Sequence, residues 1–201
     1  MNVERTIENL KKRGFEVSYF DTAPEAKAYL NQVIDGKTVG VGGSVTLQQM
    51  GLYDVLSTHN TLHWHWYAGD GVPMVDTHKQ AANAQIYLSS INAIAESGEL
   101  INIDGTGNRV ASTLYGHEKV YIVTGINKIA ENFDAALWRA RNIASPKNCQ
   151  RLSKKTPCAV KGDKCYDCDS PDRICRGLVV LWEKMSSMDM EVVLIGEELG
   201  Y

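Results

Sequence analysis

The chain has 201 residues, of which 44% are hydrophobic and 22% are charged, and its formal net charge is −3. This composition suits one well-packed domain, residues 1–201, and the weak acidic balance argues against nucleic acid or an anionic membrane as a partner. No run approaches the roughly 18 apolar residues of a membrane span, and the N-terminus lacks the apolar core of a signal peptide. We therefore expect a cytoplasmic protein.

Apolar periodicity and turn residues predict strands and helices that alternate along the chain. The expected helices cover residues 3–13, the stretch from the capping box Thr22–Glu25 to about residue 34, and residues 45–50, 76–84, 107–115 and 132–143. The expected strands cover residues 15–20, 37–41, 86–89, 93–95, 100–103, 120–124, 178–182 and 192–195. This alternation is typical of an α/β fold, a three-layer sandwich with a mostly parallel sheet.

Four cysteines gather near the C-terminal end with the spacing C-x6-C-x2-C-x6-C: Cys158, Cys165, Cys168 and Cys175. They belong to a stretch poor in large apolar residues, residues 146–177, which we interpret as a cysteine-rich insertion within the domain. Stable disulfides are unusual in the cytoplasm. A redox-active dithiol or unpaired thiols remain alternatives, but the spacing favours a metal site.

The identity of the metal is less constrained by the sequence. Four thiolates suit either Zn²⁺ or an iron–sulfur cluster. A single C-x-x-C flanked by two longer arms favours a 4Fe-4S cluster over zinc. The fifth cysteine, Cys149, lies nine residues before Cys158, and we expect it to be a small buried apolar residue.

Two loops are expected at the carboxyl ends of strands, where open α/β sheets bind ligands. In the first, residues 40–46, glycines let the backbone approach an anion and Ser44 and Thr46 offer hydroxyls. A purely structural glycine turn is the alternative.

The second loop region, residues 92–109, combines carboxylates, carboxamides, glycines and a guanidinium. Arg109 could clamp a carboxylate or phosphate, and Asp104 or Glu96 could act as a general base. In the structural alternative, Asp104 caps the next helix and Arg109 forms a salt bridge.

Three histidines, His59, His63 and His65, lie close together among aromatic residues. They could bind a metal, form an aromatic lid over a pocket, or simply pack.

The segments GVGGSVTLQQMGL, NAIAESGELINIDGTGNRVA and TPC…CYDC…SPDRIC…VVLIGEELGY resemble the LUD-domain family of lactate-utilisation proteins. The resemblance extends from about residue 3 to residue 201, and the cysteine motif is similar to that of a subset of the family. It implies the fold shared by sugar-phosphate isomerases and CoA transferases. It also implies a substrate site at the positions Gly42, Gly43, Ser44, Thr46, Asn92, Glu96, Asp104, Gly105, Gly107, Asn108 and Arg109.

The resemblance implies a role in oxidising lactate to pyruvate, in a complex with iron–sulfur partner subunits. The chain carries no flavin or nicotinamide fingerprint and no tandem ferredoxin motif, so we expect a metal-cluster subunit or accessory factor. The alternative is an enzyme of the isomerase or dehydratase type that acts on a small hydroxy acid or sugar phosphate and holds a structural zinc. Either way we expect a small anionic substrate, and homo-oligomers are compatible with the sequence.

Overall fold

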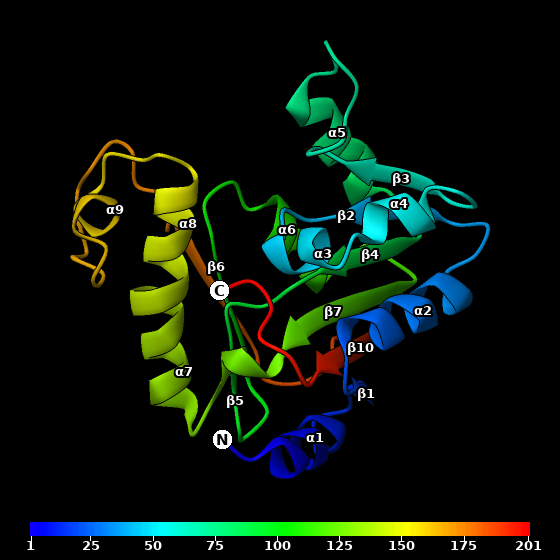
Figure 1. Ribbon diagram of the computed structural model, residues 1–201, viewed down its shortest axis with the longest axis horizontal. Coiled ribbons are helices and arrows are strands. Elements are labelled where there is room, and N and C mark those ends of the chain that lie inside the picture. Colours follow the sequence, from blue (N-terminus) through cyan, green and yellow to red (C-terminus); the bar gives the residue numbers. More distant parts are fainter.

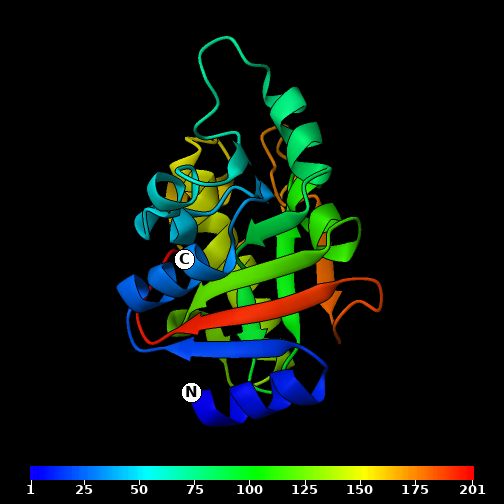
Figure 2. The same ribbon diagram turned by 90° about the vertical axis from the view of Figure 1, so that its right-hand side faces the viewer.

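The computed structural model describes residues 1–201 and contains two β-sheets with helices on their outer faces (Figure 1). The larger sheet has six strands, and every neighbouring pair is parallel. Its strands, in spatial order, are β1 (Glu16–Phe20), β10 (Asp189–Ile195), β7 (Lys119–Gly125), β4 (Ile86–Ser89), β2 (Thr38–Val41) and β3 (Thr61–Trp64). Figure 2 shows β1, β10 and β7 side by side.

The smaller sheet has four strands and mixed pairing. Its spatial order is β8 (Ile129–Ala130), β5 (Ala93–Ala95), β6 (Leu100–Asp104) and β9 (Gly177–Leu181). Strands β5 and β6 form an antiparallel hairpin, as the sequence predicts, and its turn contains Gly98 with a φ of 97°. Strand β9 adds to β6 in antiparallel register. The final predicted strand pair is therefore divided between the sheets, because β9 joins the smaller one and β10 the larger one.

The helical elements connect these strands. They are α1 (Val3–Lys12), α2 (Ala23–Val33), α3 (Val45–Gln49), α4 (Leu52–Leu56), α5 (Met74–Ala82), α6 (Asn108–Leu114), the 3-10 turn η1 (Ile126–Lys128), α7 (Phe133–Arg139), the π-helical turn η2 (Ala140–Ala144), α8 (Ser145–Arg151) and α9 (Pro157–Lys161). The predicted capping box is present, since the Thr22 hydroxyl accepts from the Glu25 N–H and the Glu25 carboxylate accepts from the Thr22 N–H. Such a cap contributes about 1 kcal/mol.

The larger sheet is buried on both faces, and its strands alternate between two apolar cores. On β10, Val193 and Ile195 face the core beneath α2, α3 and α4. Met190, Val192 and Leu194 face the opposite core, which also contains residues of α1 and of the smaller sheet. Side chains of a strand alternate between faces with a period of two, so a shift of one residue would exchange the two cores. Burying one such side chain contributes about 1.5–3 kcal/mol.

The other face of the smaller sheet packs against the helix that starts with α7. Ala93, Ala95 and Ile101 contact Ala136 and Ala140 in a third, smaller cluster. The predicted α/β sandwich with its mostly parallel sheet is thus confirmed. The structure adds a second sheet between the large sheet and α7.

The helix predicted to end near residue 143 continues to Arg151 through α7, η2 and α8. Pro146 has no N–H and its ring crowds the preceding turn, so it does not fit the interior of a regular α-helix. The chain instead widens into a π turn before the proline. There the Ala140 carbonyl accepts both the backbone N–H and the hydroxyl of Ser145, the latter at 2.9 Å. The first part of the expected insertion is therefore helical.

The cysteine segment, as we call residues 152–176, follows α8. Apart from α9 it contains no helix or strand, and it lies beside α8 at the edge of the molecule (Figure 1). No helix of the protein combines the length and the apolar character that crossing a bilayer requires.

Candidate functional site

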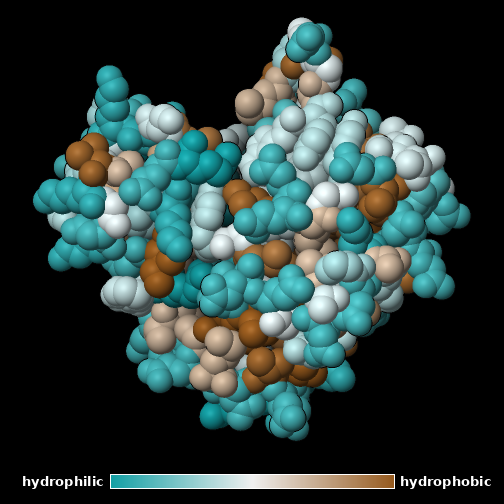
Figure 3. All heavy atoms as spheres, viewed as in Figure 1, coloured by the Kyte–Doolittle hydropathy of each residue, from teal (hydrophilic) through white to brown (hydrophobic).

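A cavity of about 590 Å³ lies where the strands of the larger sheet end. Its lining includes residues that directly follow β2, β3 and β4, together with the loop after β6. Figure 3 shows the molecule hollowed between the lobe that carries the cysteine segment and the lobe that carries α5. The carboxyl ends of parallel strands are where α/β folds bind ligands, so the cavity occupies the position predicted from the sequence.

The glycine loop after β2 supplies part of this lining through Gly43, Ser44 and Thr46. Ser44 caps α3, because its hydroxyl accepts from the Leu47 N–H at 3.3 Å. Gly42 does not line the cavity, but a Cβ at this position would lie 3.0 Å from the Cγ atom of Arg109. The glycine therefore leaves room for the Arg109 side chain.

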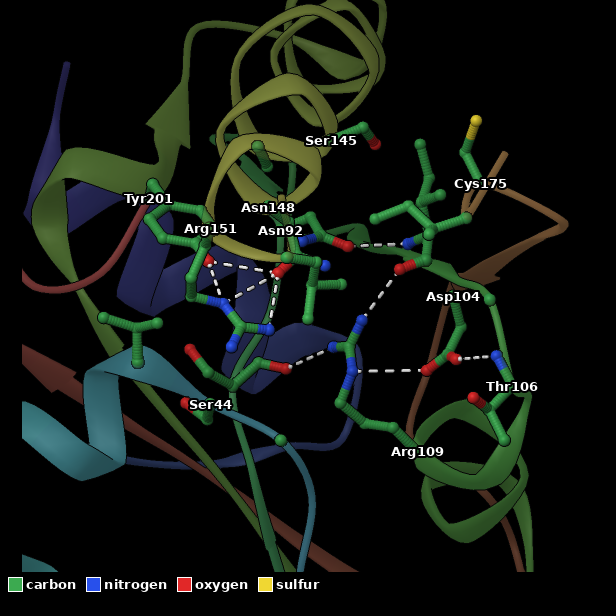
Figure 4. Close-up of a pocket in the computed structure, with 18 of the residues that line it drawn as sticks. Ser44, Asn92, Asp104, Thr106, Arg109, Ser145, Asn148, Arg151, Cys175 and Tyr201 are labelled. Atoms are coloured by element: carbon green, nitrogen blue, oxygen red, sulfur yellow. Dashed lines mark hydrogen bonds and ion pairs between the residues drawn. The ribbon is translucent and has the colours of Figure 1, made fainter. Parts of the chain in front are cut away.

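The loop after β6 is organised around Asp104. One carboxylate oxygen accepts from the N–H groups of Thr106 and Gly107 at 3.0 and 2.9 Å. The other lies 3.3 Å from Arg109 Nε (Figure 4). Gly107 has a φ of 91°, which favours glycine. Asp104 thus folds the loop and holds Arg109, while Asp104, Gly105 and Asn108 also line the cavity.

Arg109 is nearly saturated by the protein itself. Its Nη1 donates to the Ser90 carbonyl at 3.1 Å and to the Asn102 side chain at 2.5 Å, and its Nη2 donates to the Ile103 carbonyl at 2.8 Å. With the Asp104 contact, four of the five guanidinium N–H groups have partners. Arg109 therefore brings positive charge to the cavity but retains one free N–H, too few for a bidentate clamp.

Asn92 lines the cavity, but its side-chain oxygen accepts from the Ile103 N–H at 2.6 Å and so joins the two loops. Glu96 lies elsewhere. Its carboxylate accepts from the Asn2 N–H at 2.8 Å and lies 3.6 Å from the N-terminal ammonium. It is buried against α1, outside the cavity lining, and pins the start of the chain.

Lys128 is a buried residue of the cavity lining that the sequence did not indicate. It ends the turn η1 just after β7, lines the cavity and is 3% exposed. Its Nζ atom donates to the hydroxyls of Thr46 and Ser90 at 3.0 and 2.9 Å. Burial lowers its pKa to about 7, with the cations Arg139 and Arg109 adding to the effect. The one available signal was its place after the predicted strand 120–124, at the same sheet edge as the loop after β2.

The three histidines do not form a group that could hold a metal ion. His59 contacts the side chains of Asn31 and Asp35 at 2.8 and 3.0 Å, whereas His65 lines the cavity beside His78 with ring centroids 4.6 Å apart. Burial, followed by repulsion from His78 and Arg151, lowers the pKa of His65 to about 4, so this imidazole is neutral at pH 7.

Trp66 also lines the cavity, and the guanidinium of Arg151 lies 4.9 Å from the centre of its ring. Neutral imidazole and indole rings therefore form one wall of the cavity. Part of the predicted aromatic lid thus faces the pocket, while His59 lies apart from it.

The cavity is strongly cationic. Its lining contains six lysines and arginines against two carboxylates, which are Asp104 and Asp172. The cations are Arg109, Lys128, Arg151, Lys154, Arg173 and Arg176. In a partly enclosed site such an excess attracts anions.

The cysteine segment forms one wall of the same cavity. Cys175 is on this wall and lies near the Asp104 loop (Figure 4). Arg176 N–H donates to the Asp104 carbonyl at 2.9 Å. A Cβ on Gly105 would lie 2.5 Å from the Ile174 carbonyl oxygen, so the segment packs closely only because residue 105 is glycine.

The four motif cysteines differ in burial, since Cys158 is buried and the other three are half-buried. Burial together with neighbouring Cys158 and Cys175 raises the pKa of the Cys149 thiol to about 11. Cys165 and Cys175 open on a second cavity of about 260 Å³. No group of three or more histidine, cysteine or acidic side chains is arranged to hold a metal ion. Cys149 is buried, as expected.

The chemistry of the donors nevertheless fits a thiolate-bound group. None of the cysteines is in a disulfide. The guanidinium of Arg173 donates to the Cys168 and Cys175 carbonyls at 2.9 and 3.0 Å, and Arg141 Nη2 lies 3.9 Å from the Cys165 sulfur. These cations would offset the negative charge of a tetrathiolate centre.

Comparison with known proteins gives a family and a fold. The family model for the LUD domain matches residues 3–195. The crystal structure of a DUF162 family protein from Deinococcus radiodurans is similar over 96% of this chain and 95% of that chain, with a TM-score of 0.54 and 10% sequence identity. At that identity the likeness establishes a shared fold. No curated protein matches the chain.

Proposed function

The chain belongs to the LUD-domain family, which is associated with lactate utilisation, and on that premise we propose that its cavity binds a small 2-hydroxy acid or the corresponding 2-oxo acid. We propose further that the protein serves as a subunit or accessory factor in the oxidation of lactate to pyruvate. The observation that carries this proposal is a buried lysine amine, Lys128, which lies beside two hydroxyls and lines a cationic cavity.

The charge of the cavity supports recognition of a carboxylate. Arg109 is fixed by its protein partners, so it contributes positive potential without having to reorganise when an anion arrives. Ser44 adds a hydroxyl to the same lining. Small anions would therefore be drawn in by a preorganised field, and Arg109 would orient them through its remaining N–H.

Lys128 is suited to moving the proton of the substrate hydroxyl. With a pKa of about 7 it exists at neutral pH as both amine and ammonium. It can therefore accept a proton and return it near the operating pH. The hydroxyls of Thr46 and Ser90 lie within hydrogen-bond distance of its Nζ atom and could pass that proton on.

We also propose that Cys158, Cys165, Cys168 and Cys175 hold a 4Fe-4S cluster, with Zn²⁺ as the alternative. A cluster would supply one-electron transfer, whereas zinc would stabilise the cysteine segment. The proposal is supported by four thiols within one segment and by the arginines around them. Iron, sulfide and zinc contents and the visible spectrum of protein purified without oxygen test it. A colourless, metal-free, folded protein would contradict it.

A second function is favoured by the cations of α8 and of the cysteine segment that line the cavity. Arg151, Lys154, Arg173 and Arg176 provide more positive charge than one carboxylate needs, and about 590 Å³ is large for a three-carbon acid. These features suit a phosphorylated ligand. The alternative is therefore an isomerase- or dehydratase-type enzyme acting on a sugar phosphate or larger hydroxy acid.

Calorimetric titration with L-lactate, pyruvate and ribose 5-phosphate separates the two functions. We expect lactate or pyruvate to bind and Lys128→Met to weaken binding roughly 10- to 100-fold, the effect of losing one hydrogen bond to a charged group. The matched control is Lys147→Met, on the exposed side of α8 outside the cavity. Tighter binding of the sugar phosphate would favour the second function. Binding of none of the three compounds would contradict both.

A further inference from the structure

The environment of the Lys128 amine differs from that of the half-buried Lys119 and the buried Arg139. Lys119 pairs with the carboxylates of Glu16 and Glu191 at 2.6 and 2.8 Å. Arg139 donates to the carbonyls of Asn127 and Asn92 at 3.0 and 2.6 Å. Lys128 has neither kind of partner, because its Nζ atom meets only two hydroxyls. A structural lysine with no anion would carry a large desolvation cost.

Lys128 is almost fully enclosed by the protein and lines the cavity. The C-terminal tail passes so near that a Cβ on Gly200 would lie 3.3 Å from Nζ and 2.5 Å from the Thr46 hydroxyl. Arg109 and Arg139 are the charged groups that act on the amine, and both are cations. They disfavour the ammonium form, as does burial, which brings the pKa to about 7. A lysine that is desolvated and next to another cation is the usual form of an amine nucleophile.

We propose that Lys128 forms a Schiff base with the carbonyl carbon of a 2-oxo acid bound in the cavity. This inference rests on the proposed function for the class of ligand, and it adds a covalent step. The nitrogen lone pair forms a C–N bond while the carbonyl π electrons move to oxygen. One of the two nitrogen protons passes to that oxygen and gives a neutral carbinolamine with one proton left on nitrogen. Loss of the nitrogen proton and of the hydroxyl as water then leaves the imine. The step needs no oxidant or reductant.

The two hydroxyls that contact the Lys128 amine supply the proton route that these reaction steps require. Thr46 Oγ1 and Ser90 Oγ lie 3.4 Å apart, and each contacts Nζ. A hydroxyl can donate and accept at once, so the pair can take the proton from nitrogen and deliver one to the departing hydroxyl. The free N–H and positive charge of Arg109 would hold the carboxylate of the oxo acid, which keeps its carbonyl facing the amine.

Reductive trapping of the full-length protein tests the inference. The wild type is incubated at neutral pH with pyruvate and cyanoborohydride, which reduces an imine to a stable amine, and the adduct is located by peptide mass spectrometry. We expect one pyruvate-derived adduct, at Lys128, that is absent without pyruvate. Lys128→Arg should abolish it, and Lys147→Arg should retain it.

The possible results separate this inference from the proposed function. An adduct at Lys154, which also lines the cavity, or at the N-terminus instead of Lys128 would overturn the Schiff base. Absence of any adduct overturns it as well, whether or not pyruvate binds. Lactate binding that persists without an adduct would leave the proposed function standing. An adduct at Lys128 without lactate binding would support the covalent step and remove the hydroxy-acid function.

Discussion

Replacing Lys128 with methionine should change how the stability of the protein depends on pH. Burial, with help from Arg139 and Arg109, lowers the pKa of Lys128 from its ordinary 10.5 to about 7. The unfolded chain therefore holds this proton more tightly than the native state does. The free energy of unfolding therefore decreases as the pH falls from about 10.5 towards about 7. Below about pH 7 the buried amine is protonated, and the whole cost of burying its charge remains.

The size of the effect follows from the shift. Between pH 7 and pH 9 the unfolded lysine stays protonated while the native one loses its proton. Linkage then predicts that the unfolding free energy of the wild type rises by about 2 kcal/mol from pH 7 to pH 9 because of Lys128 alone. The Lys128→Met variant has no amine to titrate and lacks this contribution. Methionine has a similar length and avoids burying a charge, so the variant should fold.

Urea unfolding of the two proteins across this pH range measures the difference directly. Groups other than Lys128 contribute equally to both proteins. Burial disfavours the charged form of Lys119, but its contacts with Glu16 and Glu191 outweigh that effect and raise its pKa, so it stays charged across this range. We expect the unfolding free energy of the wild type to increase relative to that of Lys128→Met as the pH rises. A gap that stays constant from pH 7 to pH 9 would mean that Lys128 titrates like an exposed lysine, and the argument for a neutral amine would fail.

Three further predictions concern the surroundings of the cavity. Gly105→Ala would place a Cβ 2.5 Å from the Ile174 carbonyl oxygen and so push the cysteine segment away from the Asp104 loop. Limited proteolysis should then cut the cysteine segment faster than in the wild type, and unchanged cleavage would contradict this packing. Glu96→Gln should lower the unfolding free energy by about 1 kcal/mol, the worth of a typical hydrogen bond, while calorimetry finds ligand binding unchanged. Cys168→Ser should reduce the amount of metal bound per chain, measured by elemental analysis, whereas Cys149→Ala should bind as much metal as the wild type. Equal metal content in the two variants would refute the ligand assignment.

The sequence predicted the location of the cavity because strand ends are local features. The glycines that follow β2 and the polar run that follows β6 are each visible within about ten residues. The loop after β2 lies at the carboxyl edge of the parallel sheet, whereas β6 belongs to the smaller sheet and is antiparallel to both of its neighbours. The roles within those loops depended on contacts that a sequence does not display. Arg109 forms the salt bridge of the structural alternative, with Asp104. Asp104 does not cap the next helix, because its carboxylate accepts from the N–H groups of Thr106 and Gly107 in the loop.

Lys128 and Glu96 show why the remainder could not be predicted. Both are charged residues close to predicted strands, and nothing local distinguishes them. Lys128 is buried because the C-terminal tail, more than 70 residues later, packs over it with Gly200. Glu96 is drawn away from the cavity by Asn2, at a separation of 94 residues. Only the tertiary fold decides which of these two becomes part of a site.

The Asp104 loop links the ligand cavity to the cysteine segment. On one side its carboxylate holds Arg109, and on the other its carbonyl accepts from the N–H of Arg176, the residue next to Cys175. An anion that draws on Arg109 and a metal that orders Cys175 would therefore act on the same few residues. Linkage requires each to change the affinity of the other by the same factor. Ligand titrations with metal-loaded and metal-free protein measure that factor. Equal dissociation constants would mean that the loop keeps one arrangement in both states.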